Sequence, residues 1–186
     1  LHGGRAMITR RGFLASSVLA ALHGAAHPTR AASRTLPWRN WSGNQLAHPA
    51  GRFAPASEAE LADWLKGSTG PLRAVGAGHS FSGLVPTEGE LVVLDRIAGL
   101  LEHDAERRQA TFGAGTRLSD IGPALESVGQ GPMILPDIDR QTLAGAIATA
   151  THGTGADLHS MSGYVTALRL ITARGEARDI DAASNP

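Results

Sequence analysis

The chain has 186 residues, of which 42% are apolar, so it is long enough and apolar enough to bury a hydrophobic core. Its 17 basic and 17 acidic side chains cancel, which gives no reason to expect a nucleic acid or an acidic membrane surface as its main partner. Cysteine is absent, which excludes disulfides, thiolate metal sites and cysteine nucleophiles.

The first residues have the pattern of a twin-arginine export signal. Arg10 and Arg11 precede an apolar run from Phe13 to Leu22, and small residues that could be cleaved follow. An N-terminal amphipathic helix is the alternative, but the order of these features favours the signal. We therefore expect translation to start at Met7 and residues 1–33 to lie outside the domain. This route carries folded proteins, so we expect export to the periplasm or beyond, with the twin-arginine machinery as a partner.

Strands and helices alternate in the first part of the remaining chain, which opens with Trp38-Arg39-Asn40-Trp41-Ser42-Gly43. Ser57-Glu58-Ala59-Glu60 is a capping box, and the apolar residues behind it predict a helix. A short strand is predicted over residues 72–75, and residues 91–94 form an apolar run typical of a strand covered on both faces. We expect a small α/β lobe over about residues 38–99.

The pattern changes near residue 100. A strand is predicted over residues 109–112, and helices over 118–128 and 142–149. Residues 165–172 alternate as a strand does, and Arg174-Gly175 can turn the chain back into a second strand over 177–180. These elements predict a second, more antiparallel α+β lobe over residues 100–186, so the domain spans 34–186.

A glycine-rich loop follows the strand at 72–75 and reads Val75-Gly76-Ala77-Gly78-His79-Ser80-Phe81-Ser82. Its backbone N–H groups can turn toward an anion, and its serines add hydroxyl donors, so the loop suits a pyrophosphate. It lacks the third glycine of a Rossmann motif and the Gly-Lys-Ser/Thr of a phosphate loop. A tight structural turn is the alternative, and that interpretation is favoured for an isolated G-x-G.

A second segment of small residues runs from Thr142 to Gly155. Small residues let a helix pack against a flat, extended ligand, and hydroxyls and exposed amides can hold the polar edges of that ligand. A helix packed closely against a neighbouring element explains this segment alone equally well. Two such segments in one chain favour a ligand.

Together, G-A-G-H-S-F-S and Q-T-L-A-G-A-I-A-T-A-T-H-G-T-G resemble the FAD-binding domain of the vanillyl-alcohol oxidase superfamily, in particular its aldonolactone and alditol oxidases, which include gulonolactone and arabinonolactone oxidases. The resemblance runs from about residue 38 to the end. It implies a two-lobed α+β fold with extended FAD between the lobes. The residues that it implies at the cofactor are Val75, Gly76, Ala77, Gly78, His79, Ser80, Phe81, Ser82, Pro136, Asp137, Thr142, Gly145, Ala146, Ala148, His152, Gly153 and Ile180.

Two of these residues carry more specific expectations. His79 matches the histidine that bonds covalently to the flavin 8α-methyl group in this family, whereas a hydrogen bond to the phosphates is the alternative. Pro136 matches a position beside the reactive edge of the flavin, where many relatives have a smaller residue, and it gives weak support for access of oxygen. For His152 and Gly153, close packing is favoured over chemistry.

The resemblance implies an FAD-dependent oxidoreductase that oxidises a CH–OH group of a sugar lactone or polyol, with oxygen as the acceptor and hydrogen peroxide as a product. We assign no catalytic residue and no metal site to this chain, and we expect the substrate domain that follows in the family to be absent. A non-catalytic flavin-binding module and an FAD-dependent reductase with non-covalent flavin are the alternatives.

Overall fold

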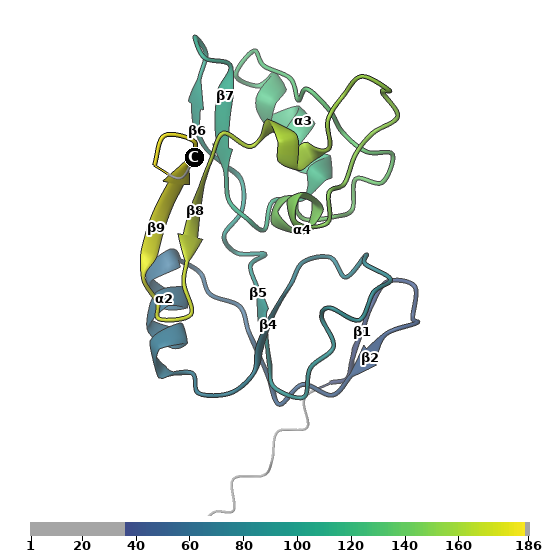
Figure 1. Cartoon of the computed structure of the whole chain (residues 1–186), viewed down its shortest axis with the longest axis vertical. Coiled ribbons are helices and arrows are strands. Elements are labelled where there is room, and N and C mark those ends of the chain that lie inside the picture. The colour runs from purple at the N-terminus through teal and green to yellow at the C-terminus, as the bar shows by residue number, and fades with distance from the viewer. Residues whose placement is uncertain (1–35, 185–186) are drawn as a thin grey trace, which may run out of the picture. The chain divides into compact units, whose positions relative to one another are not determined.

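The computed structural model describes residues 36–184 (Figure 1), so the predicted export signal and the predicted start at Met7 lie outside the described residues. The fold mixes helices and strands, as predicted. In chain order the elements are β1 (Trp38–Arg39), β2 (Leu46–Ala47), β3 (Gly51–Phe53), α2 (Glu58–Gly67), β4 (Leu72–Val75), β5 (Glu90–Val93), β6 (Leu100–Asp104), β7 (Gln109–Phe112), α3 (Leu118–Glu126), α4 (Leu143–Ala148), the 3-10 helix η1 (Met161–Tyr164), β8 (Ala167–Ile171) and β9 (Ala177–Asp181). None of the helices in residues 36–184 is both long and apolar enough to cross a membrane.

The first part of the chain forms a parallel sheet of three strands in the order β3-β5-β4. Helix α2 connects β3 to β4, and the predicted capping box forms: the backbone N–H of Glu60 donates to Ser57 Oγ at 3.1 Å, and Glu60 Oε2 accepts from the backbone N–H of Ala56 at 2.6 Å. Central strand β5 buries Leu91 and Val92, which point to opposite faces. The prediction of a strand covered on both faces is thereby confirmed.

After residue 100 the strands pair in two antiparallel hairpins, β6–β7 and β8–β9. Helix α3 ends two residues before the predicted end because Gly129 has a φ of 72°, and the chain turns there. The last strand pair starts at Ala167 and not at Val165, since η1 ends at Tyr164 and Val165 caps it through a backbone N–H bond to the Ser162 carbonyl. Both differences concern the ends of elements that were otherwise predicted.

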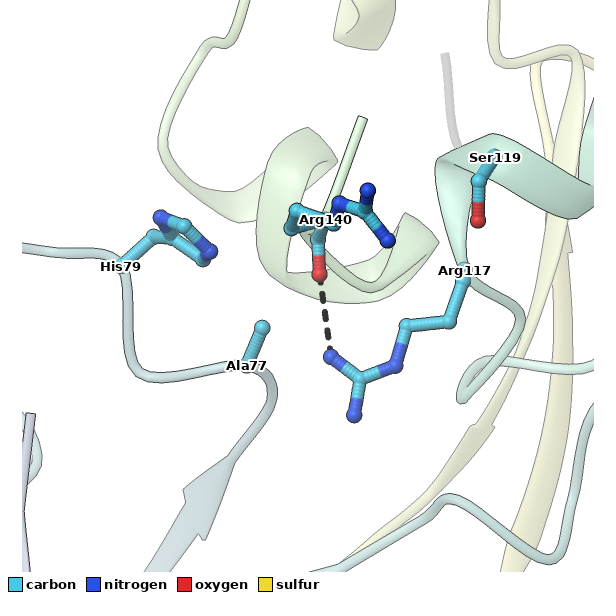
Figure 2. A pocket seen from close by; sticks show the side chains of 5 residues that line it. All are labelled: Ala77, His79, Arg117, Ser119 and Arg140. Atoms are coloured by element: carbon cyan, nitrogen blue, oxygen red, sulfur yellow. Dashed lines mark hydrogen bonds between the residues drawn. The ribbon is translucent and has the colours of Figure 1, made fainter. Parts of the chain in front are cut away.

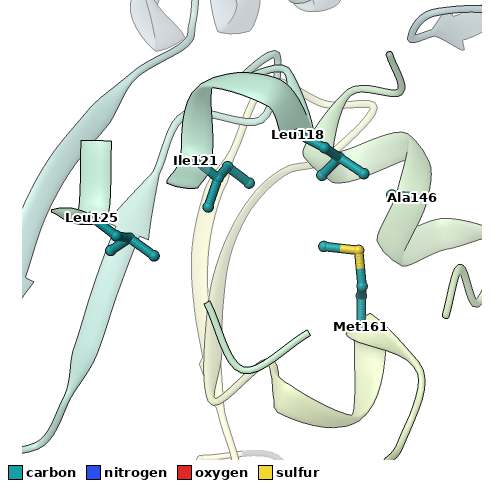
Figure 3. Packing of buried hydrophobic residues seen from close by; sticks show 5 residues of the cluster. All are labelled: Leu118, Ile121, Leu125, Ala146 and Met161. Atoms are coloured by element: carbon teal, nitrogen blue, oxygen red, sulfur yellow. The ribbon is translucent and has the colours of Figure 1, made fainter. Parts of the chain in front are cut away.

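Two separate clusters of buried side chains form the core. One lies under the parallel sheet and contains Trp38, Ala47, Val75 and Leu91. The other joins α3, α4 and η1 through Leu118, Ile121, Leu125, Ala146 and Met161 (Figure 3). The small side chain of Ala146 is fully buried, which lets α4 approach the larger apolar residues of α3.

The β8–β9 hairpin packs on α2 (Figure 1). Arg169 on β8 donates from Nε to Glu58 Oε2 at 2.7 Å, and its Nη1 contacts Asp179 on the paired strand at 2.8 Å. A side chain at Gly175, in the hairpin turn, would collide with the backbone oxygen of Ala62 in α2. The C-terminal hairpin is therefore attached to a helix from the first part of the chain.

Candidate functional site

The two glycine-rich segments predicted to bind a ligand meet in the structure. Gly76 directly follows β4, and Thr142 is the residue before α4. A Cβ on Gly76 would overlap Thr142 Oγ1, so only glycine lets the loop lie this close to α4. Thr142 is buried, and its hydroxyl does not cap its own helix. The hydroxyl faces the loop instead.

The carbonyl groups of the loop are held from one side by the segment that follows β1. The buried side chain of Asn40 donates from Nδ2 to the Ser80 carbonyl at 3.0 Å, and its Oδ1 accepts from the backbone N–H of Gln45 at 3.0 Å. The backbone N–H of Trp41 donates to the Gly78 carbonyl at 2.9 Å. These bonds tie the loop to the first turn of the domain.

A second pair of bonds fixes the far end of the loop. The amide groups of Asn44 and Gln45 each donate to the Phe81 carbonyl at 3.1 Å. Ser80 and Ser82 exchange a hydrogen bond between their hydroxyls at 2.8 Å. With its carbonyls occupied in this way, the loop has a defined shape.

The N–H side of the same loop is available to a ligand. Among the described residues, none accepts a hydrogen bond from the backbone N–H groups of residues 77–81. Gly78 has a φ of 69°, a conformation in which successive N–H groups can converge on one anion. A run of anchored carbonyls with free amides opposite them is the arrangement expected of an anion-binding loop.

His79 projects from this loop with its ring against that of Trp41. The ring centroids lie 5.3 Å apart and the ring planes differ by 20°. Neither ring nitrogen of His79 is hydrogen-bonded to another residue in the described part of the chain. The indole thus covers one face of the imidazole, while the edge that carries the nitrogens remains open.

A hollow of about 270 Å³ lies beside the loop, and its lining residues come from three segments (Figure 2). They are Ala77, His79, Arg117, Ser119 and Arg140. Arg117 Nη1 donates to the backbone oxygen of Arg140 at 3.0 Å, and its Nη2 lies 3.6 Å from Asp95. Within residues 36–184, Arg140 has an ion pair only with its neighbour Asp139, at 3.4 Å. Two residues of the loop, Ala77 and His79, and two arginines therefore line one space.

A second hollow has a volume of about 260 Å³, and one of its lining residues, Gln141, follows Arg140 of the first hollow in the chain. It is lined by Pro136, Asp137, Ile138, Gln141, Thr151, His152, Gly153 and Thr154. His152 Nδ1 lies 2.8 Å from the carbonyl oxygen of Gly153. Because a carbonyl oxygen can only accept a hydrogen bond, Nδ1 is the donor. The buried Gln141 Oε1 has no hydrogen-bond partner among the described residues. The predicted residues 136, 137, 152 and 153 thus share one site.

None of the other predicted residues lines either hollow. Gly145, Ala146 and Ala148 are on α4, where Ala146 packs into the core. Ile180 is half-buried on β9 and pairs with Leu168. Polar residues in or beside the site that were not predicted as site residues are Asn40, Arg117, Ser119, Arg140, Gln141, Thr151 and Thr154. Asn40 had a visible signal, a polar residue between two tryptophans at the start of the domain.

The sequence profile of the family described as "FAD binding domain" matches residues 49–181. The chain belongs to this family. It is 38% identical over 142 residues to an L-gulono-1,4-lactone dehydrogenase of Mycobacterium tuberculosis, covering 75% of this chain and 33% of that protein. It is 30% identical over 160 residues to a D-arabinono-1,4-lactone oxidase of Candida glabrata, covering 82% of this chain and 30% of that protein.

The fold agrees with this assignment. A solvent-stable cholesterol oxidase superposes with a TM-score of 0.64 and 25% sequence identity, over 78% of this chain and 32% of that one. The resemblance predicted from the two motifs, with its α+β fold, is confirmed. This FAD-binding domain spans about a third of the length of the curated relatives that it matches.

Proposed function

We propose that this chain holds FAD with the loop at residues 76–82 and the residues of the two hollows, and serves as the flavin-binding part of an oxidoreductase that acts on a CH–OH group of a sugar lactone or polyol. Family membership supports FAD as the ligand. The names of the relatives, lactone dehydrogenase and lactone oxidase, support the substrate class.

The observation that carries the proposal is that the loop with amides free of acceptors among the described residues lines one hollow, through Ala77 and His79, together with two arginines. Residues 77–81 present backbone N–H groups, and Arg117 and Arg140 add positive charge beside them. Such groups complement a diphosphate, which has two negative charges and several acceptor oxygens. Each hollow alone is smaller than a typical ligand site of about 300 Å³ or more, whereas both together suit an elongated dinucleotide.

The second hollow provides a polar group for the cofactor. Gln141 Oε1 is a buried acceptor that no donor among the described residues reaches, a costly arrangement unless a ligand N–H group reaches it. The flavin and the adenine of FAD both carry N–H groups. FAD supplies a ring system that accepts a hydride from the substrate carbon. The protein groups around it would orient the ring and keep water away.

We further propose that His79 bonds covalently to the flavin. Its ring nitrogens form no hydrogen bond with any residue that the structure describes, and it lines the same hollow as Ala77 and the arginines. A covalent link would keep the cofactor on an exported enzyme. Export by the twin-arginine route is supported by the sequence pattern at Arg10 and Arg11.

The test is to produce the full chain, titrate it with FAD, and then denature it in acid. We expect FAD to bind with a defined stoichiometry and the yellow colour to remain with the precipitated polypeptide. In His79→Ala, the bound FAD should be fully released by acid. His103→Ala is the matched control, because His103 is a histidine on β6, away from the loop.

The outcomes separate the alternatives. Colour that acid releases from the unaltered chain contradicts the covalent link and supports a non-covalent flavoprotein such as a reductase. A chain that binds no FAD contradicts the whole proposal. Loss of colour when sugar lactones are added without air indicates an oxidoreductase, and subsequent return of colour with peroxide in air identifies oxygen as the acceptor. Stable colour with every lactone and polyol indicates a binding module.

A further inference from the structure

The stacked pair of Trp41 and His79 is not explained by packing of the core. The side chain of Trp41 is 69% exposed, yet its ring lies at 20° to the His79 ring with centroids 5.3 Å apart. Its position is set by the backbone: its N–H donates to the Gly78 carbonyl at 2.9 Å, and its neighbour Asn40 is buried and bonded to Ser80. A large apolar side chain is therefore held in solvent next to one particular histidine.

We propose that Trp41 is a positioning residue for His79, which holds the imidazole plane so that a ring nitrogen is directed at the flavin carbon to which it bonds. This role rests on the proposed covalent link. It adds to that proposal a residue outside both glycine-rich segments, contributed by the turn between β1 and β2.

The reason is directional. The lone pair of an imidazole nitrogen lies in the plane of the ring, so whatever fixes the ring plane fixes the direction of attack. A half-buried histidine on a loop can still sample more than one ring orientation, and restricting them brings the reacting atoms into line before reaction. A stacked indole restricts the plane by contact with one face and leaves the nitrogen-bearing edge open.

The chemical balance of the link leaves Trp41 without a chemical role. One C–H bond of the flavin 8α-methyl group and the imidazole N–H bond break, and a C–N bond forms between the 8α-carbon and a His79 nitrogen. The two protons and two electrons that are released reduce dioxygen to hydrogen peroxide. Trp41 neither gives nor takes a proton or an electron in this balance, so its contribution is geometric.

The experiment compares the rate at which FAD becomes covalently bonded to His79 with the affinity of the protein for FAD. Apo-protein of the full chain is mixed with FAD in air and quenched in acid at intervals, and the flavin that stays on the polypeptide is measured. Affinity is measured separately in a His79→Ala background, where no link can form. The variants are Trp41→Ala and Trp41→Phe. Trp64→Ala is the matched control, since Trp64 stacks on Phe53 at 4.6 Å and is remote from the loop.

We expect Trp41→Ala to slow linkage by about tenfold to a hundredfold, while the Kd for FAD changes by about threefold at most. Trp41→Phe should restore most of the rate, because a flat ring is kept. Because Trp41 is exposed, its removal should leave folding intact, and near-ultraviolet circular dichroism checks this.

Three results would overturn the proposal. Linkage at the unaltered rate in Trp41→Ala would mean that the stack does not position His79. An increase in Kd that matches the loss of rate would make Trp41 a cofactor contact and not a positioning residue. If the unaltered chain forms no acid-stable flavin, the covalent part of the proposed function fails first, and the positioning role is withdrawn with it.

Discussion

The hydroxyl of Thr142 occupies the space that a side chain on Gly76 would need. This contact brings the end of β4 against the start of α4, and Ala77 and His79 of the loop line the first hollow together with its arginines. The relationship between these two residues therefore determines whether the two motifs form one site.

Replacing Gly76 by Ala should destabilise the protein by about 1–3 kcal/mol, the usual cost of overpacking. Thr142 is buried, so its hydroxyl cannot move away without disturbing its surroundings. Chemical denaturation measures the change. Thr142→Ala in the same chain should recover part of the loss, since it removes the clashing atom. Gly70→Ala is the control, because a Cβ there meets nothing within 4 Å.

Replacing Arg140 by Gln should weaken FAD binding by about threefold to tenfold, since a charge-assisted contact to phosphate is lost but the side chain is largely exposed. The difference between the two proteins should shrink at high salt, because screening weakens the interaction in the unaltered protein. Calorimetric titration at two salt concentrations measures both effects. Arg107→Gln on the β6–β7 turn should change neither, and an equal effect there would exclude a local role for Arg140.

Replacing Asn40 by Asp should cost about 2–3 kcal/mol and loosen the loop. The change is nearly isosteric, but it replaces the Nδ2 donor to the Ser80 carbonyl by a buried carboxylate oxygen that repels that carbonyl. Urea unfolding and amide exchange of residues 78–82 measure the two consequences. Asn44→Asp loses one donor in an exposed position, where Gln45 still binds the same carbonyl, so its effect should be much smaller.

Acid should weaken the β8–β9 hairpin before the rest of the described domain. Hydrogen bonding to Arg174 lowers the pKa of Glu176, and the backbone N–H of Ser184 lowers the pKa of Asp181. A carboxyl group whose pKa is lower in the folded state stabilises the fold above its unfolded pKa of about 4, and this contribution is lost as the pH falls through the folded pKa. Both groups are exposed, so the effect is small and salt-sensitive.

Amide exchange of residues 167–181, measured from about pH 5 downward, follows this loss of stability through the pH range in which carboxyl groups titrate. In Glu176→Gln the contribution of the Arg174 pair is absent from the start, so the dependence of hairpin protection on pH should be shallower. An unchanged dependence in that variant would show that Glu176 does not contribute.

The sequence predicted the elements that carry strong local signals. The capping box at Ser57 specified the start of α2, and the apolar run around Leu91 specified a buried strand, because both signals come from neighbours in the chain. The β1 and β2 strands were missed, since each has only two residues and too few positions to show a period. Strand β6 was missed because Glu102, His103 and Asp104 hide its alternation.

The sequence indicates the part of the candidate site in which the backbone itself, and not a side chain, would contact the ligand. The loop at residues 76–82 could be predicted because glycine spacing reports backbone geometry directly. Arg117 and Arg140 could not be predicted, since arginines are common on surfaces and only the folded chain brings these two beside Ala77. That the predicted residues contact FAD stays a prediction.

The attachment of the β8–β9 hairpin to α2 has a consequence for how the protein folds. Arg169 and Glu58, which are joined by this attachment, lie 111 residues apart, and a contact over such a distance closes a long loop at an entropic cost. A chain that emerges from the ribosome in sequence order makes α2 and the loop around His79 well before the hairpin exists. Contacts of this kind form slowly. We therefore expect α2 and the β3-β5-β4 sheet to remain incompletely packed until β8 and β9 have been synthesised. FAD should then bind after the hairpin has been synthesised and not before.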